Sequence, residues 1–282
     1  MKCEWQTFIN IIPIWMRQHV DKLGKDTLRE LRLRRDLPPE LITNRGSVWL
    51  ERIVTRDDLD FCINITSKYS MWAQSTLASG YITAPGGHRL GICGTAIVRD
   101  GVVRGIREPT SVVIRVARDF TGIAQNIGRG NESLLILGKP GSGKTTLLRD
   151  LVRQKSDRDH RQISVVDERQ ELFPVVCGGY CFYTGRRTDV FSGYKKAIGI
   201  DAAIRCMTPE MVAVDEITAE EDCDAMIRAG WCGVKILATA HAGSREELLK
   251  RPVYKPIIES GLFDRLVILH GDNTWHIEGL NI

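Results

Sequence analysis

The sequence predicts an α/β fold for the C-terminal half of the chain and a smaller α+β domain before it. From Ser133 onward, short apolar runs alternate with helical segments, which is the pattern of a mostly parallel sheet with helices on both faces. Before that point, short strands and tight turns are typical of a small antiparallel sheet. A length of 282 residues suggests about two domains. We place their boundary in the polar, glycine-bearing stretch 122–130, which gives domains over 1–124 and 125–282.

In the N-terminal domain, helices are expected around the antiparallel sheet. Pro13 lacks a backbone N–H and should interrupt the first helix. Thr55 and Asp58 have the spacing of a capping box at the start of another helix. The predicted elements are helix 4–20, a strand within 28–35, a hairpin over 41–50, helices 55–68 and 70–79, and strands 81–83, 88–98, 102–106 and 111–117.

In the C-terminal domain, the predicted strands are short and apolar, as expected for strands that are buried on both faces. They cover residues 134–137, 163–167, 211–215, 235–240 and 265–270. A last strand over 274–278 closes a hairpin whose turn is 271–273. The helices that connect the parallel strands should cover the two faces of the sheet.

The composition is that of a soluble globular protein, with 43% hydrophobic and 26% charged residues. A net charge of +4 is too small to indicate a nucleic-acid partner by itself. The eight cysteines are scattered and no secretory signal precedes them, so we expect a reducing, cytoplasmic location. Cys177 and Cys181 form the closest pair, but without a second pair they do not indicate a zinc site. The apolar stretch 5–16 is too short to span a bilayer and is expected to be a core or docking helix.

A phosphate-binding loop is the most specific motif. Residues 138–145, G-K-P-G-S-G-K-T, fit the pattern G-x-x-x-x-G-K-[ST] between a predicted strand and a predicted helix. Lys144 should reach the β- and γ-phosphates, and the Thr145 hydroxyl should bind Mg²⁺. The predicted nucleotide-binding residues are Gly138, Lys139, Pro140, Gly141, Ser142, Gly143, Lys144, Thr145 and Thr146.

Two carboxylates follow the apolar run M-V-A-V at 211–214. In proteins with a phosphate-binding loop, the first carboxylate after such a strand holds Mg²⁺, so we assign Asp215 to the metal together with Thr145. Glu216 is then placed to act as general base on an attacking water. ATP and Mg²⁺ are the expected cofactors, and ATP hydrolysis is the expected reaction.

Further candidates lie where other strands end. Asp167 and Glu168 follow strand 163–167, and Glu168 is the second choice for the general base. His241 follows strand 235–240, where an imidazole could hydrogen-bond a phosphate. In the loop G-R-R-T-D-V, Arg187, with Arg186 as the second choice, could compensate phosphate charge across a subunit interface. A charged solvated loop is the alternative reading of the acidic pair and of the arginines, and His241 could instead cap the next helix.

These motifs, in this order, resemble the stage III sporulation protein AA family, which is similar to the hexameric ATPases of type II and type IV secretion systems. The segments that carry the resemblance are 85–94, 138–150, 165–169, 185–190, 204–217 and 238–241. The resemblance implies a RecA-like ATPase core over 125–282 and an N-terminal regulatory or assembly domain over 1–124. It places Asp167 and Glu168 in the acidic box of the secretion ATPases and His241 in their histidine box. Thr218 and the segment 192–195 depart from the family pattern, which affects expected partner contacts more than hydrolysis.

The resemblance also implies an assembly. Family members are expected to form a homo-oligomeric ring, of the hexameric kind, at the cytoplasmic face of a membrane channel between forespore and mother cell. We therefore expect a cytoplasmic protein that associates peripherally with a membrane complex, and no nucleic-acid partner. Three alternatives stay open: a nucleic-acid translocase, favoured by the arginines of 29–35 and a pI of 8.6; a nucleotide-gated scaffold that does not hydrolyse; and a small-molecule kinase.

Overall fold

The computed structural model describes residues 1–68, 78, 80–127, 130–270 and 274–280. The chain divides into two compact units, Met1–Asp119 with Pro174–Phe182, and Phe120–Phe173 with Tyr183–Ile282. Contacts thus begin the second unit at Phe120 and assign the segment 174–182 to the first unit. Hydrogen bonds tie the start of the second unit to the rest of that unit, because the Asp150 carboxylate accepts the backbone N–H groups of Gly122 (3.1 Å) and Ala124 (2.8 Å). The functional division at 124 into regulatory and ATPase domains stays a prediction.

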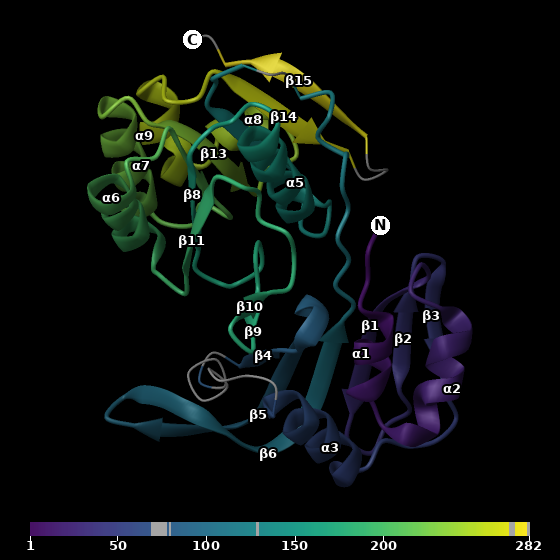
Figure 1. Cartoon of the computed structure of the whole chain (residues 1–282). Coiled ribbons are helices and arrows are strands. Elements are labelled where there is room, and N and C mark those ends of the chain that lie inside the picture. The colour runs from purple at the N-terminus through teal and green to yellow at the C-terminus, as the bar shows by residue number, and fades with distance from the viewer. Residues whose placement is uncertain (69–77, 79, 128–129, 271–273, 281–282) are drawn as a thin grey trace. The chain divides into compact units, whose positions relative to one another are not determined.

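The first unit is built on a six-stranded antiparallel sheet with the order β3-β2-β1-β6-β5-β4 (Figure 1). Its strands are β1 (Leu28–Arg34), β2 (Glu40–Thr43), β3 (Gly46–Trp49), β4 (Tyr81–Thr83), β5 (Arg89–Arg99) and β6 (Val102–Arg115). Its helices are α1 (Trp5–Asn10), α2 (Ile14–Leu23), α3 (Arg56–Ser67) and the short η1 (Pro85–Gly87). A small hairpin, β9 (Val175–Val176) with β10 (Gly179–Tyr180), completes the unit.

Several expectations for this unit are confirmed and one is corrected. The first helix is interrupted at Pro13, and Thr55 and Asp58 form the capping box. Strands expected over 102–106 and 111–117 are one strand, β6, because pairing with β5 continues across the irregular stretch near Glu108. The arginine-rich strand β1, predicted within 28–35, is half-buried, with Leu31 and Leu33 in the core. The helix expected over 70–79 lies outside the described residues, apart from helical Ala78.

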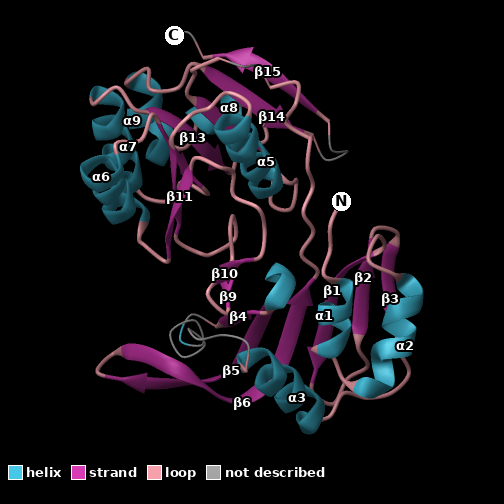
Figure 2. Cartoon of the chain, viewed as in Figure 1, coloured by secondary structure: helices cyan, strands magenta, loops and turns pink. Residues whose placement is uncertain are grey.

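The second unit has a seven-stranded sheet with the order β11-β8-β12-β13-β7-β14-β15, parallel except for β15. Its strands are β7 (Leu134–Leu137), β8 (Ile163–Asp167), β11 (Thr188–Ser192), β12 (Met211–Val214), β13 (Lys235–Ala240), β14 (Arg265–Leu269) and β15 (Trp275–Gly279). Its helices are α5 (Lys144–Asp157), α6 (Lys196–Met207), α7 (Glu220–Trp231), α8 (Arg245–Leu249), η2 (Pro252–Tyr254) and α9 (Lys255–Glu259). Figure 2 shows α6, α7 and α9 gathered on one side of this sheet and α5 on the other. The predicted α/β fold with a mostly parallel sheet is confirmed.

The register of the parallel strands sets the position of the site. Val214 at the end of β12 pairs with Val166 of β8 and with Ala238 of β13, and Leu137 of β7 pairs with Ala240. The residues that follow these strands therefore emerge along one edge of the sheet. Strand β11 was missed in the sequence, since T-D-V-F-S has little apolar character, and its pairing with β8 alone defines it. None of the helices formed by the described residues is long and apolar enough to cross a membrane.

Candidate nucleotide site

The loop between β7 and α5 has the backbone that a phosphate-binding loop requires. Gly141 (φ +76°) and Gly143 (φ +95°) adopt left-handed conformations that favour glycine, and α5 begins directly afterwards at Lys144. Gly138 is needed for a different reason, because a Cβ there would lie 2.3 Å from Ser142 Oγ and 3.3 Å from Leu269 Cβ. The helix start adds its partial positive charge to the loop, which suits an anion.

Lys144 is held within the site by three acceptors. Its Nζ donates to the carbonyl oxygens of Gly138 (2.8 Å) and Lys139 (3.0 Å) and to His241 Nδ1 (3.0 Å). Burial lowers the pKa of Lys144, and the nearby carboxylates of Asp215 and Glu216 oppose that shift. An arriving phosphate must therefore compete with the loop's own carbonyls for this ammonium group.

Asp215 lies against the start of α5. Thr145 Oγ1 donates to Asp215 Oδ2 (2.8 Å), and Thr239 Oγ1 donates to Asp215 Oδ1 (2.6 Å). Neighbouring ligands of an octahedral Mg²⁺ lie about 2.9 Å apart, given bond lengths of about 2.0–2.1 Å. The separation of the Thr145 hydroxyl and the Asp215 carboxylate therefore fits a magnesium ion. No cluster of three or more His, Cys, Asp or Glu residues suited to a metal occurs among the described residues, so phosphate and water oxygens would complete the shell.

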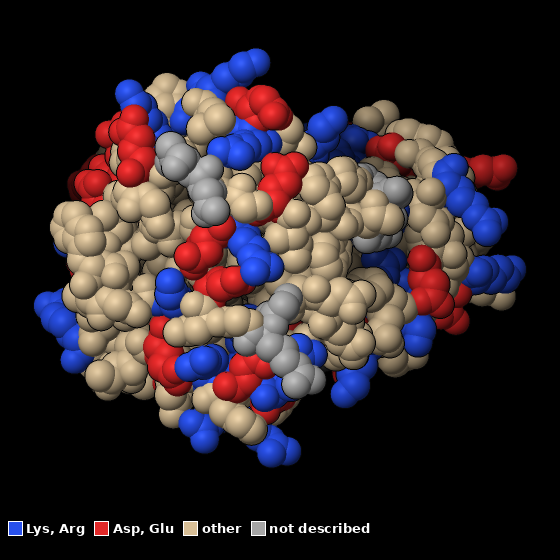
Figure 3. Space-filling model, turned by 90° about the horizontal axis from the view of Figure 1, so that it is seen from above, with Lys and Arg blue, Asp and Glu red and all other residues tan. Residues whose placement is uncertain are grey.

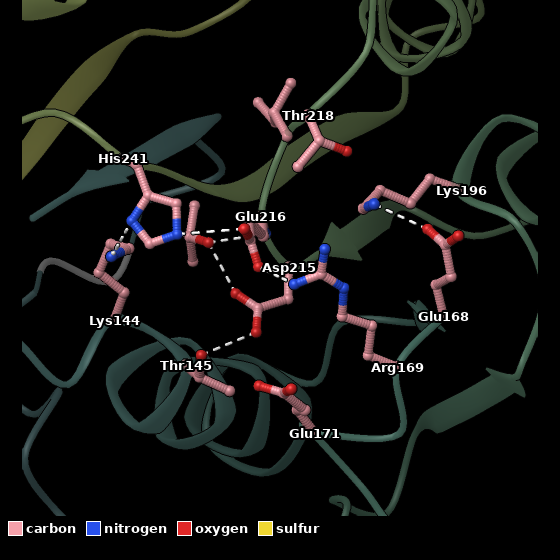
Figure 4. Close-up of polar contacts among 12 residues, drawn as sticks. Lys144, Thr145, Glu168, Arg169, Glu171, Lys196, Asp215, Glu216, Thr218 and His241 are labelled. Atoms are coloured by element: carbon pink, nitrogen blue, oxygen red, sulfur yellow. Dashed lines mark hydrogen bonds and ion pairs between the residues drawn. The ribbon is translucent and has the colours of Figure 1, made fainter. Parts of the chain in front are cut away.

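Glu216 is fixed at both ends of its carboxylate (Figure 4). Its Oε1 lies 3.2 Å from His241 Nε2, and its Oε2 lies 2.6 Å from Arg169 Nη1. Because Lys144 donates to His241 Nδ1, the other ring nitrogen, Nε2, is the one that faces the Glu216 carboxylate. The backbone of Glu216 is left-handed (φ +52°), and its N–H donates to Thr239 Oγ1 (2.8 Å).

Asp167 and Glu168 contact other groups of the second unit and do not pair with Lys144 or Glu216. Asp167 is buried and accepts the backbone N–H groups of Glu171 (2.9 Å) and Phe173 (2.8 Å), so it shapes the loop that follows β8. Burial raises the pKa of Asp167 to about 6. Glu168 pairs with Lys196 at 2.7 Å. The role of Glu168 as a second-choice base stays a prediction.

Arg186 and Arg187 lie at the opposite edge of the sheet from the phosphate-binding loop. The carbonyl oxygen of Arg187 accepts the N–H of Ile163 (2.9 Å), where β8 begins, whereas the site lies where the strands end. Five strand residues span about 16 Å. Both arginine side chains are exposed. The structure therefore does not bring them to the chain's own P-loop, and their action across a subunit interface stays a prediction.

Two contacts of the site were missed in the sequence. Arg169 reaches Glu216, and the buried Lys196 joins Glu168 to Asp222, whose carboxylate lies 3.7 Å away. Arg169 stands in the segment V-V-D-E-R that attracted notice for its carboxylates. A basic residue directly after two carboxylates indicates a possible ion pair at this strand end, whereas no local pattern indicates the role of Lys196.

The fold and the site together define a protein of the α/β class with a P-loop nucleotide-binding fold. The family model described as "Sporulation stage III, protein AA" matches residues 5–280, and the chain belongs to that family. A relative from Bacillus subtilis (strain 168), "Stage III sporulation protein AA", is 38% identical over 272 residues, covering 92% of this chain and 89% of the relative. The uncharacterised protein ycf45 of Cyanidium caldarium is 31% identical over 143 residues, covering 49% of this chain and 42% of that protein.

Solved structures share the fold. The Legionella pneumophila ATPase DotB is 16% identical with a TM-score of 0.54, over 94% of this chain and 79% of that chain. The pilus retraction motor PilT with bound ADP is 14% identical with a TM-score of 0.60, over 89% of this chain and 76% of that chain. At these identities the likeness concerns the fold alone. The chain is thus a homologue of a sporulation protein, with the fold of secretion and pilus ATPases.

Proposed function

We propose that the chain is a Mg²⁺-dependent ATPase that performs mechanical work for a sporulation-associated channel or secretion complex. The observation that carries the proposal is an unbroken series of contacts. It runs from Lys144 through His241 to Glu216, next to the Thr145–Asp215 pair. A cation for phosphate, a pair of oxygens for the metal and a candidate base lie within one edge of the sheet. This is the set of groups that hydrolysis of a nucleoside triphosphate requires.

Each residue has a role in this proposal. The amides of the loop 138–145 and Lys144 bind the β- and γ-phosphates, and Thr145 and Asp215 hold the magnesium ion. That ion would supply charge compensation for the phosphates when bound. Glu216 takes a proton from the attacking water. When Lys144 turns to the phosphates, His241 loses its contact with Lys144 and turns to the phosphate as well. His241 thereby links nucleotide binding to the candidate base.

The assembly proposed is a homo-oligomeric ring, hexameric as in the secretion ATPases that the family resembles. We place it at the cytoplasmic face of a membrane channel complex, as a peripheral component. Membership of the family and the shared fold with DotB and PilT support this proposal.

The nucleic-acid alternative loses its main support. Arg34 pairs with Glu40 at 2.9 Å, Arg32 with Glu30, and Arg35 with Asp36 at 3.4 Å, so the arginine-rich stretch is largely neutralised within the first unit. On the face drawn in Figure 3, acidic and basic side chains are interspersed and do not gather by sign. Nucleic-acid binding depends on a continuous basic surface, which this pattern does not favour.

Replacing the candidate base tests the proposal. We expect Glu216→Gln to bind ATP and to hydrolyse it about 10²–10⁴-fold more slowly than the parent, because the amide keeps the shape but cannot accept the proton. Single-turnover hydrolysis with Mg²⁺, measured with and without DNA, gives both the rate and the dependence on nucleic acid. Glu210→Gln is the matched control, since this glutamate is also paired with an arginine, Arg161, but it precedes β12 and lies away from the site.

Two results would contradict the proposal. A parent protein that binds ATP but does not hydrolyse it at any protein concentration would favour the nucleotide-gated scaffold. A rate that rises steeply when DNA is added would favour the translocase. An unchanged rate in Glu216→Gln would instead move the base, with Glu168 as the next candidate.

A further inference from the structure

The guanidinium of Arg169 forms an ion pair with the Glu216 carboxylate, which the proposed reaction needs as its base. Its Nη1 lies 2.6 Å from Glu216 Oε2, while His241 holds the other carboxylate oxygen. Figure 4 shows Arg169 and His241 approaching Glu216 from opposite sides. With both oxygens engaged, the candidate base has reduced capacity to bind and orient a water. This arrangement is therefore one in which hydrolysis is held back, and one contact must change before the reaction.

The surroundings of Arg169 are strongly acidic. A small cavity of about 10 Å³, room for about one water molecule, is lined by Asp167, Glu168, Arg169, Glu171, Lys196, Asp215 and Glu216. Lys196, the other basic residue of this lining, is buried and pairs with Glu168 and Asp222. Arg169 has 50% of its side chain exposed, so it can change partner without leaving a buried cavity behind. Its position beside Asp215 places it next to the oxygens expected to hold the metal.

A bound γ-phosphate would change the contacts that Lys144, His241 and Arg169 make. Lys144, held by Gly138, Lys139 and His241, would turn to the phosphates, and the His241 contact with Glu216 would change with it. The γ-phosphate carries more negative charge than a carboxylate and offers several acceptor oxygens, which a planar guanidinium can bind in pairs. A diphosphate offers no such group at this position.

We propose that Arg169 exchanges Glu216 for the γ-phosphate of a bound nucleoside triphosphate. The exchange frees the base only when a triphosphate is present, and it makes Arg169 a determinant of the preference for ATP over ADP. This inference rests on the proposed ATPase function.

The test measures the affinities for ATP and ADP with Mg²⁺ in the Glu216→Gln variant. In Glu216→Gln, the carboxylate that Arg169 neutralises is already absent, so removing Arg169 does not expose it to the γ-phosphate, and slow hydrolysis lets ATP itself be used. We compare Glu216→Gln with Glu216→Gln/Arg169→Gln. The added change should weaken ATP binding about tenfold and leave ADP binding within about twofold, since a charge-assisted contact to the γ-phosphate is lost.

The matched control is Glu216→Gln/Arg161→Gln. Arg161 is also a part-exposed arginine paired with a glutamate, Glu210 at 2.5 Å, but it precedes β8 and so lies at the other edge of the sheet. It should change neither affinity. Equal weakening of ATP and ADP, or no weakening of either, by Arg169→Gln would overturn the inference while leaving the ATPase proposal intact. If Glu216→Gln itself binds neither nucleotide, the proposed function fails, and this inference fails with it.

Discussion

Thr239 orients both carboxylates that follow β12. Its side chain is fully buried, its hydroxyl donates to Asp215 Oδ1 at 2.6 Å, and the same oxygen accepts the N–H of Glu216 at 2.8 Å. One hydroxyl on the neighbouring strand therefore fixes the carboxylate proposed to hold the metal and the left-handed backbone of the candidate base. A buried hydroxyl with two partners of this kind is a positioning group, not one that contacts substrate.

We predict that Thr239→Val lowers the ATPase rate about 10- to 100-fold, because small displacements of reacting groups are costly. Valine keeps the shape, but it leaves Asp215 and the N–H of Glu216 without the hydroxyl, which should also lower the free energy of unfolding by about 1–3 kcal/mol. Steady-state hydrolysis and chemical denaturation measure the two effects. Thr239→Ser retains the hydroxyl and should stay close to the parent. Equal rates in the valine and serine variants would show that this orientation does not matter.

At the residue scale, the sequence predicted what local spacing determines. Lys144 and Thr145 follow from a motif of eight positions, and Asp215 and Glu216 follow from the rule that parallel strands end at one edge of a sheet. The partners of Glu216 could not be predicted in the same way. Whether Arg169 turns toward Glu216 depends on the path of the loop after β8, and that path is set by the Asp167 carboxylate and backbone N–H groups several residues away.

At the scale of elements, His88 joins two segments of the first unit. Its Nδ1 accepts the N–H of Ala117 (3.0 Å), so Nε2 carries the proton and donates to the carbonyl oxygen of Glu4 (3.0 Å). The ring also packs edge-on against Phe8 of α1. Burial lowers the pKa of His88 to about 4. The neutral imidazole thus ties the start of the chain to the segment that follows β6.

We predict that this connection weakens in acid. The native pKa of His88 lies below the unfolded value of about 6.5, so the unfolded chain binds more protons between pH 6.5 and 4. Stability from this group is therefore present above about pH 6.5 and is lost as the pH falls toward 4, by up to about 3 kcal/mol. Asp167 in the second unit acts in the opposite direction, since its pKa is raised to about 6.

A local probe separates the two groups. Trp5 stacks on Phe8 at 5.2 Å between ring centroids. With Trp231 and Trp275 of the second unit replaced by Phe, tryptophan fluorescence reports on the first unit during denaturant titrations at pH 4 to 7. His88→Gln should flatten the pH dependence of the unfolding free energy, and His19→Gln, at an exposed position of α2, should leave it unchanged. A parent-like pH dependence in His88→Gln would assign the effect to other groups.

Element prediction succeeded where apolar periodicity is strong and failed where pairing is distant. The buried strands β7, β8, β12, β13 and β14 each carry a short apolar run, and their positions were predicted closely. Strand β11 contains only two apolar residues, side by side, a pattern that also suits a loop, and its five parallel pairs with β8 define it. Similarly, β6 was divided in two because Glu108 and Pro109 indicate a turn, although the pairing with β5 resumes beyond them.

At the scale of the whole chain, the two units are not simply consecutive. The chain leaves the second unit after Phe173, forms the β9–β10 hairpin as part of the first unit, and returns at Tyr183. Phe182 lies so close to Gly87 that a Cβ there would be 2.8 Å from its ring, which explains a glycine with φ +79°. No local pattern in 174–182 indicates this, because the segment is defined by contacts with residues about ninety positions earlier.

The position of Arg187 makes a specific demand on any ring. This exposed arginine stands at the edge of the sheet where β8 and β11 begin, while the P-loop stands at the other edge. Within one chain it does not complete the chain's own site. We expect a head-to-tail ring to bring this edge of one subunit to the P-loop edge of its neighbour, and an arginine supplied in this way contributes about 10³–10⁵ to the rate of phosphoryl transfer. We therefore predict that Arg187→Ala alone is inactive although its own P-loop is intact.

Mixtures of variants test this prediction directly. Lys144→Ala lacks the cation of the P-loop but keeps Arg187, so an interface between the two variants can combine an intact loop with an intact arginine. Hydrolysis should reappear on mixing and should be greatest near equal proportions, provided that the ring does not require every site to act. The matched control mixes Arg187→Ala with the double variant Lys144→Ala/Arg187→Ala, which cannot supply the arginine and should restore nothing. Full activity of Arg187→Ala by itself would exclude the role, and Arg186→Ala would then be the variant to mix.

ATP affinity of Arg187→Ala, measured at concentrations that keep the protein monomeric, should equal that of the parent, because an arginine that acts across an interface has no contact with nucleotide in the isolated chain.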